Sequence, residues 1–283
     1  MINTEVFRPD QVPGQYNITN EQYHASEGIS SSGLKLFARS PAHYYAAYLD
    51  PNRQPRKETP AFELGSLIHS AVLEPEKYFA QFYPLPRKLD RRLKDDKLEA
   101  EFHEGKAAEM GMKVITAEQH QTCERIVEAV HNSPAGSFLF GQAGLVEQSF
   151  YWQDWQHGVL CKARPDKLLP QYATILDLKS TTSAAKSDFA RHAYNFEYHI
   201  SAAFYMRGVE AVTGEAVKSF VFFPFEKEPP YACAFYEPDA QMLQAANNRI
   251  DTILANYAEC LRTGEWPGYP QEIEPISLPA WAV

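Results

Sequence analysis

Two aspartates and a lysine stand close together in the stretch ARPDKLLPQYATILDLKSTTS, residues 163 to 183. If the second half is a strand, alternate side chains share a face, so Asp177 and Lys179 lie side by side. Buried charges need a partner, and Asp166 with Asp177 could hold Mg²⁺ through their oxygens. A lysine beside such an ion could orient or deprotonate the water that attacks a phosphodiester. An ordinary Asp–Lys pair on a solvated face is the alternative.

A histidine occupies the middle of an apolar segment with helical spacing, FELGSLIHSAVLEP, residues 62 to 75. Thr59-Pro60 is a helix start signal, and Glu74-Pro75 ends the pattern. His69 follows Gly65 by one helical turn, so the absent side chain leaves room for a close approach. The residue is either a metal ligand or a hydrogen-bonded histidine of the core.

The remaining periodicity predicts the elements that must position these groups. Helices are expected at residues 60–74, after a capping box at Thr116–Gln119, at 184–213 and at 239–263. Strands are expected at residues 145–153, 158–169, 172–180, 217–225 and 231–238. This order predicts an α/β fold, a mixed central β-sheet flanked by helices.

Composition and periodicity also divide the chain into three regions. Residues 1–28 form a polar N-terminal arm without periodicity, residues 29–263 form one domain, and residues 264–283 form a proline-rich C-terminal tail. Residues 84–113 are highly charged, which predicts an exposed helix or a mobile loop that either keeps the chain soluble or contacts a substrate.

Composition excludes several classes. The net charge of −9, from 27 basic and 36 acidic residues, argues against a general nucleic-acid coat but permits one local basic groove. The four cysteines form no CxxC pair, which disfavours a zinc ribbon or an iron–sulfur cluster. No apolar run reaches the roughly 18 residues of a membrane helix, and the start lacks a secretion signal. We therefore expect a cytoplasmic protein without a membrane partner.

Four motifs in order resemble the PD-(D/E)xK nuclease superfamily, in particular the RecE-type nuclease domain of exodeoxyribonuclease VIII, which is related to the RecB-like nucleases. They are FxxGxxxHxxxLEP at Phe62–Pro75, then ARPDxL, ILDLKST and YHISAAFYMRG. The resemblance runs from about Ile29 to Tyr236 and implies a restriction-endonuclease-like core.

The resemblance also implies roles. The metal ligands would be His69, Asp166, Asp177 and the backbone carbonyl of Leu178. Lys179 would be the catalytic lysine, working with Asp166 and Asp177. The ion would be Mg²⁺, with Mn²⁺ as the alternative. Glu147 matches a recurrent acid of related nucleases and is either a second acid of the site or a surface glutamate.

One motif departs from the RecB-like pattern Gln-x-x-x-Tyr, because the chain keeps Tyr205 but has Ser201 where that pattern has the amide. A serine cannot span the same distance, so DNA positioning by that site is in question. Tyr198, His199 and Thr181 are further candidates for contact with DNA. For Thr181, capping of the next helix is the alternative.

The resemblance implies an exonuclease that degrades double-stranded DNA ends, 5′-to-3′, in phage or prophage recombination. Its partners would be DNA ends and a single-strand annealing protein, and a ring-shaped homo-oligomer would suit processive digestion. Two alternatives stay open: an endonuclease or a nuclease of opposite polarity, and a catalytically degenerate module that binds DNA or a partner.

Overall fold

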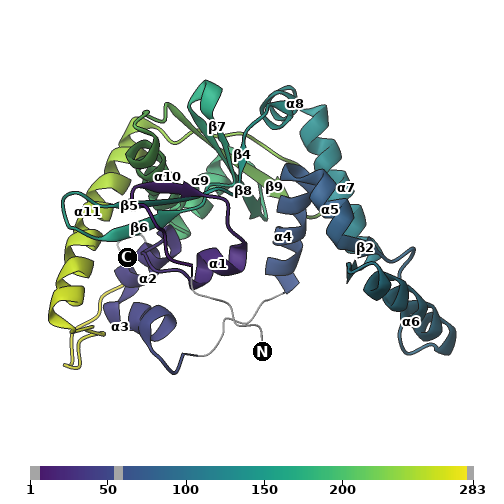
Figure 1. Cartoon of the computed structure of the whole chain (residues 1–283), viewed down its shortest axis with the longest axis horizontal. Coiled ribbons are helices and arrows are strands. Elements are labelled where there is room, and N and C mark those ends of the chain that lie inside the picture. The colour runs from purple at the N-terminus through teal and green to yellow at the C-terminus, as the bar shows by residue number, and fades with distance from the viewer. Residues whose placement is uncertain (1–6, 54–59, 279–283) are drawn as a thin grey trace.

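Two β-sheets form the centre of the molecule in the computed structural model, which describes residues 7–53 and 60–278 (Figure 1). The larger sheet has the order β4 (Leu145–Val146), β7 (Lys167–Leu169), β8 (Thr174–Thr181) and β9 (Ser219–Glu226). β8 and β9 are parallel, and the other neighbours are antiparallel. The smaller sheet has the order β1 (Gly14–Tyr16), β5 (Ser149–Gln153) and β6 (Leu160–Ala163). A separate parallel pair joins β2 (Phe82–Pro84) to β3 (Lys113–Ile115).

Helices cover both faces of the larger sheet. On one face, α4 (Pro60–Leu73) and α7 (Ala117–Asn132) pack on Leu178 and Phe223. On the other, α9 (Lys186–Asn195) and α10 (Tyr198–Thr213) pack on Ile175 and Phe222. The remaining helices are α1 (Asn20–Ala25), α2 (Ser31–Arg39), α3 (Pro41–Tyr44), α5 (Pro75–Gln81), α6 (Lys94–Glu109), α8 (Pro134–Gly141) and α11 (Ala240–Thr263), with short helical turns at Tyr45–Leu49 and Pro170–Tyr172. The predicted α/β fold is confirmed.

Two of the predicted strands are each divided between the two sheets. Residues 145–153 break at Glu147, whose φ of 50° lies in the left-handed region, so β4 joins the larger sheet and β5 the smaller. Residues 158–169 break between β6 and β7 at Arg164–Asp166, where Pro165 has no N–H to donate to a ladder. Both strands therefore change sheets at the same place, and each break carries an acid of the candidate site.

The strand predicted at residues 231–238 is wrong, because only isolated bridges form there, Phe222 with Tyr236 and Phe225 with Cys233. Pro224 explains the interruption: Ala234 donates its N–H to the Pro224 carbonyl at 3.0 Å, but the proline has no N–H to return. The helix predicted at 184–213 is likewise two helices, separated at Glu197, which has a φ of 51°.

The terminal and charged segments also have defined structure. The expected irregular arm contains β1, which pairs with β5, and α1, which begins at a capping box formed by Thr19 and Gln22. The charged stretch forms α6, an exposed helix that extends away from the sheets together with β2 (Figure 1). The capping box predicted at Thr116 and Gln119 is confirmed. The division into arm, domain and tail stays a prediction.

The helix α10 approaches β5 through Gly208, and this contact gives a stability prediction. A Cβ at Gly208 would lie 2.5 Å from the buried Trp152 ring, so Gly208→Ala must displace that ring. We expect a loss of about 2 kcal/mol in the free energy of unfolding, typical of an overpacked core. Urea unfolding measures it, with Gly105→Ala as the control, because a Cβ at Gly105 on α6 meets nothing within 4 Å. Equal stability of both variants would contradict this packing.

Candidate active site

A cavity of about 810 Å³ lies where the two strand breaks, β8, α4 and the beginnings of α2 and α10 meet. Its lining includes the sequence-predicted site residues His69, Glu147, Asp166, Leu178, Lys179, Tyr198, Ser201 and Tyr205. Gly65 also lines it, and a Cβ there would meet nothing within 4 Å, as expected from the helical spacing to His69. Residues more than 100 positions apart in the sequence therefore line one cavity.

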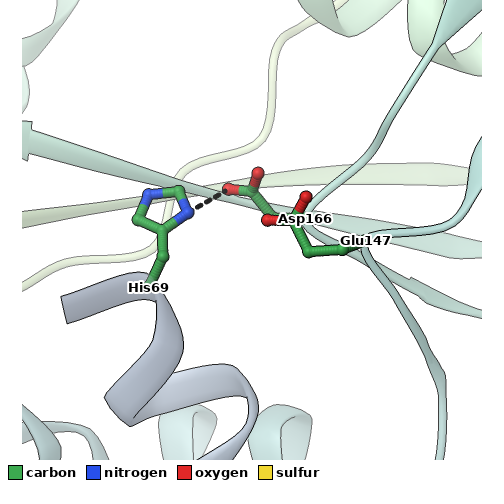
Figure 2. Close-up of side chains that lie close together, drawn as sticks. All are labelled: His69, Glu147 and Asp166. Atoms are coloured by element: carbon green, nitrogen blue, oxygen red, sulfur yellow. Dashed lines mark ion pairs between the residues drawn. The ribbon is translucent and has the colours of Figure 1, made fainter. Parts of the chain in front are cut away.

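Three of these side chains form the cluster in Figure 2: His69 from α4, Glu147 from the break after β4, and Asp166 from the break before β7. Each offers one ligand atom, and these atoms all lie within 4.8 Å of one another. His69 Nδ1 is 3.7 Å from Asp166 Oδ2. A set of carboxylate oxygens with one imidazole fits a divalent cation such as Mg²⁺ or Mn²⁺.

Backbone hydrogen bonds hold the two acids next to each other. The Glu147 N–H donates to the Asp166 carbonyl at 3.1 Å, and the Leu178 N–H donates to Asp166 Oδ2 at 2.6 Å. The pairing of β7 with β8 stops at Leu176, so the edge of β8 beyond that point is open toward Asp166. Because N–H and C=O of one strand residue point to the same edge, the Leu178 carbonyl faces this side as well. This orientation supports its proposed role as a ligand.

Arg164 holds Glu147 in place. Its guanidinium donates to Glu147 Oε2 at 2.9 Å, to Ser149 Oγ at 2.9 Å and to the Ile18 carbonyl at 3.0 Å. Burial raises the pKa of the Glu147 carboxyl, and the nearby Asp166 carboxylate raises it further, while His69 and Arg164 oppose them. Two acids that repel each other in a partly buried place favour a bound cation between them.

Removal of Arg164 should therefore weaken metal binding without removing a ligand. Second-sphere partners of ligating carboxylates typically account for about 10- to 100-fold in metal affinity, and we expect Arg164→Gln to lose that much for Mn²⁺. Titration calorimetry with Mn²⁺ measures the change. The control is Arg191→Gln, because the exposed Arg191 side chain pairs with Asp188 within α9, outside the cavity lining. Unchanged affinity in Arg164→Gln would contradict the placement of Glu147 at the metal.

Asp177 and Lys179 form the second part of the site. Lys179 Nζ lies 2.5 Å from Asp177 Oδ2, and the Asp177 side chain is 1% exposed, so the pair is not on a solvated face. Neither carboxylate oxygen of Asp177 has a hydrogen bond of good geometry among the described residues. Burial raises the pKa of Asp177, and Lys179 opposes that rise. Burial lowers the pKa of Lys179, but Asp177 and Asp166 outweigh it, so the net shift is upward. Asp177 therefore anchors Lys179, and it lies outside both the lining of the cavity and the His69–Glu147–Asp166 cluster.

The DNA-contacting candidates fall into two groups. Tyr198, Ser201 and Tyr205 line the cavity, with the Tyr205 hydroxyl accepting from Ser31 Oγ at 3.4 Å. His199 is absent from the lining, and Thr181 is 6% exposed, donating to the Ser183 carbonyl at 3.0 Å. Thr181 therefore bonds within the turn after β8. It does not cap α9, whose N-cap residue is Ala185, so the capping alternative is wrong, and the DNA contact stays a prediction.

Arg164 and Lys35 are among the cavity residues that were not predicted from the sequence. Arg164 stands two residues before Asp166, so the ARPD motif already placed it near the site. Lys35 lies on α2, more than 160 positions from Ser201, which it contacts. No local spacing connects those two residues.

The sequence matches, over residues 30–279, the family described as "PDDEXK-like domain of unknown function (DUF3799)". The chain belongs to this family. The predicted membership of the PD-(D/E)xK superfamily, drawn from the four motifs, is confirmed, and the RecE type stays a prediction. No match was found among curated proteins.

Two solved structures are similar to this chain. One, named "Putative exonuclease", from Eubacterium rectale, has a TM-score of 0.56 and 18% identity, covering 91% of this chain and 97% of that chain. Another, a phage related exonuclease from Haemophilus somnus 129PT, has a TM-score of 0.37 and 11% identity, covering 84% of this chain and 97% of that chain. The first supports the PD-(D/E)xK fold. No helix in the described ranges is long and apolar enough to cross a membrane.

Proposed function

We propose that this PD-(D/E)xK protein is a divalent-metal-dependent exodeoxyribonuclease that hydrolyses double-stranded DNA ends, 5′-to-3′. The observation that carries the proposal is the meeting of a possible metal-ligand cluster and a lysine in one cavity. The cavity is lined by the cluster of His69, Glu147 and Asp166 and by Lys179, whose ammonium pairs with the buried Asp177. If the Asp177–Lys179 pair served the fold alone, the cluster of His69, Glu147 and Asp166 near it would have no role.

The ligands would be His69, Glu147, Asp166, Asp177 and the Leu178 carbonyl. The short distance between Glu147 and Asp166 favours Glu147 as an acid of the site over a surface glutamate. A bound divalent ion supplies Lewis-acid polarisation of the phosphate and lowers the pKa of a water molecule. Lys179 faces the cavity with an ammonium anchored by Asp177, so it can orient the attacking water or balance charge on the phosphate. The Leu178 N–H fixes Asp166, which keeps the first acid aimed at the cavity.

The proposed biological role, partner, assembly and location rest on the resemblance to RecE-type nucleases. They are phage- or prophage-type recombination, a single-strand annealing partner, a homo-oligomeric ring and a cytoplasmic location. The TM-score to the exonuclease-named structure from Eubacterium rectale supports the shared fold on which they depend. Light scattering of the purified chain tests for the ring. A ring of at least three subunits would have a mass of three or more times the 32.1 kDa of one chain.

A paired digestion tests polarity and the need for an end. Linear duplex DNA labelled separately at the 5′ and the 3′ terminus is incubated beside the same DNA as a closed circle, with Mg²⁺ or Mn²⁺. The proposal predicts early release of the 5′ label and an intact circle. Early release of the 3′ label would reverse the polarity, and a cut circle would make the protein an endonuclease.

A further inference from the structure

Lys35 on α2 also lines the cavity that contains Lys179. It has no role in the reaction proposed above. Its Nζ donates to Ser201 Oγ at 3.1 Å and to the Phe196 carbonyl at 3.3 Å. Both acceptors are uncharged oxygens. Among residues 7–53 and 60–278, no carboxylate forms an ion pair with this ammonium, although Glu147 and Asp166 line the same cavity.

The two lysines are arranged around one aromatic ring. Lys179 Nζ lies 5.2 Å from the centre of the Tyr198 ring, and Lys35 Nζ lies 5.8 Å from it. Each cation is stabilised by the ring, but the ring does not neutralise either. Burial and the positive charge of Lys179 lower the pKa of Lys35, Asp177 and Glu197 oppose the shift, and the net value is about 8. A partly buried cation without a counter-ion, facing a cavity, indicates that the occupant of the cavity is an anion.

Ser201 has a place in this arrangement. Its side chain is 4% exposed, too short to reach across the cavity, and its hydroxyl accepts the hydrogen bond from Lys35. Ser201 on α10 therefore binds a lysine from another helix, α2. The geometry points to Lys35 as a DNA contact that binds a backbone phosphate next to the scissile one, with Ser201 as the residue that positions it.

This inference rests on the proposed function for its substrate, and a binding experiment separates the two. Dissociation constants for a duplex with a labelled end are measured by fluorescence anisotropy in chelator, where no cleavage occurs, over about 50 to 200 mM salt. Loss of one phosphate contact reduces the slope of log affinity against log salt by about 0.9. For Lys35→Met we expect that loss of slope and about 10- to 100-fold weaker binding, because a hydrogen bond to a charged group is lost.

Matched variants isolate the contact from general charge and from folding. Lys218→Ala removes an exposed lysine at the far end of β8 and β9, outside the cavity, and should leave the salt slope unchanged. Lys35→Arg keeps the charge and should restore most of the slope, whereas Ser201→Ala should weaken binding less than Lys35→Met. The melting temperature of Lys35→Met should be unchanged or higher, because the folded state loses an uncompensated cation.

The outcomes separate the two proposals. A salt slope in Lys35→Met equal to that of wild type overturns the role of Lys35 even if the protein cleaves DNA. A reduced slope in Lys35→Met, together with a wild-type protein that cleaves nothing under Mg²⁺ or Mn²⁺, supports the phosphate contact and overturns the nuclease. A melting temperature that falls sharply in Lys35→Met, with an unchanged slope, would assign Lys35 to structure alone.

Discussion

Lys179→Ala should bind linear duplex DNA and cleave it about 10²- to 10⁴-fold more slowly than wild type, the range that a positioned proton donor or acceptor contributes. The reason is its position: Lys179 is anchored by Asp177 and faces the cavity beside Asp166. The loss should appear in kcat, because the ammonium acts on charge that develops during the reaction. Single-turnover cleavage at saturating enzyme measures it.

Two controls keep this prediction apart from a folding defect. Lys179→Ala leaves Asp177 buried without its counter-ion, and breaking a buried pair from one side typically costs about 3–5 kcal/mol. The double variant Asp177→Asn with Lys179→Met removes both charges, so it should be more stable than Lys179→Ala but equally inactive. Lys218→Ala should retain full activity. Substantial cleavage by a folded Lys179→Ala would contradict the assignment.

Asp166→Asn should abolish the stabilisation of the protein by Mn²⁺ or Mg²⁺ together with its nuclease activity. Asp166 lies in the cluster with His69 and Glu147, and its Oδ2 is oriented by the Leu178 N–H, so an amide there removes a charge at the centre of the ligand set. A ligand at 100 times its dissociation constant adds about 2.7 kcal/mol to the free energy of unfolding. For a chain of this size we expect an increase of roughly 5 °C in the melting temperature of wild type and none in the variant.

Asp154→Asn is the matched control for Asp166→Asn. Asp154 is also a buried aspartate, but it accepts the His157 N–H at 2.9 Å outside the cavity lining. Its variant should lose stability yet keep the full metal-induced increase in melting temperature. If Asp166→Asn keeps that increase while Asp154→Asn loses it, the metal site is elsewhere.

The parts of the site that follow a regular period could be predicted from the sequence. A period of two along residues 174–180 placed Asp177 and Lys179 on one face, and their side chains pair at 2.5 Å. The helical spacing of Gly65 and His69 indicated an open approach to the imidazole, and both residues line the cavity. Local backbone geometry determines these relations, so no knowledge of the tertiary structure is needed.

The parts that depend on a change of sheet could not be predicted. Glu147 adopts a φ of 50°, which its residue type does not indicate, and it stands beside Asp166 at the point where the predicted strand breaks. Strain of this kind is concentrated at functional sites, where surrounding structure holds it. Lys35 was missed for a different reason, since its contact with Ser201 joins α2 to α10 across the fold.

The most direct test of the central claim is cleavage of one linear duplex by wild type, Lys179→Ala and Asp166→Asn, each with Mg²⁺, with Mn²⁺ and with chelator. The account predicts degradation by wild type with either metal, none with chelator, and loss of degradation in both variants. Degradation by wild type in chelator, or degradation by either variant at the wild-type rate, would contradict a metal-dependent site built from Asp166, Asp177 and Lys179.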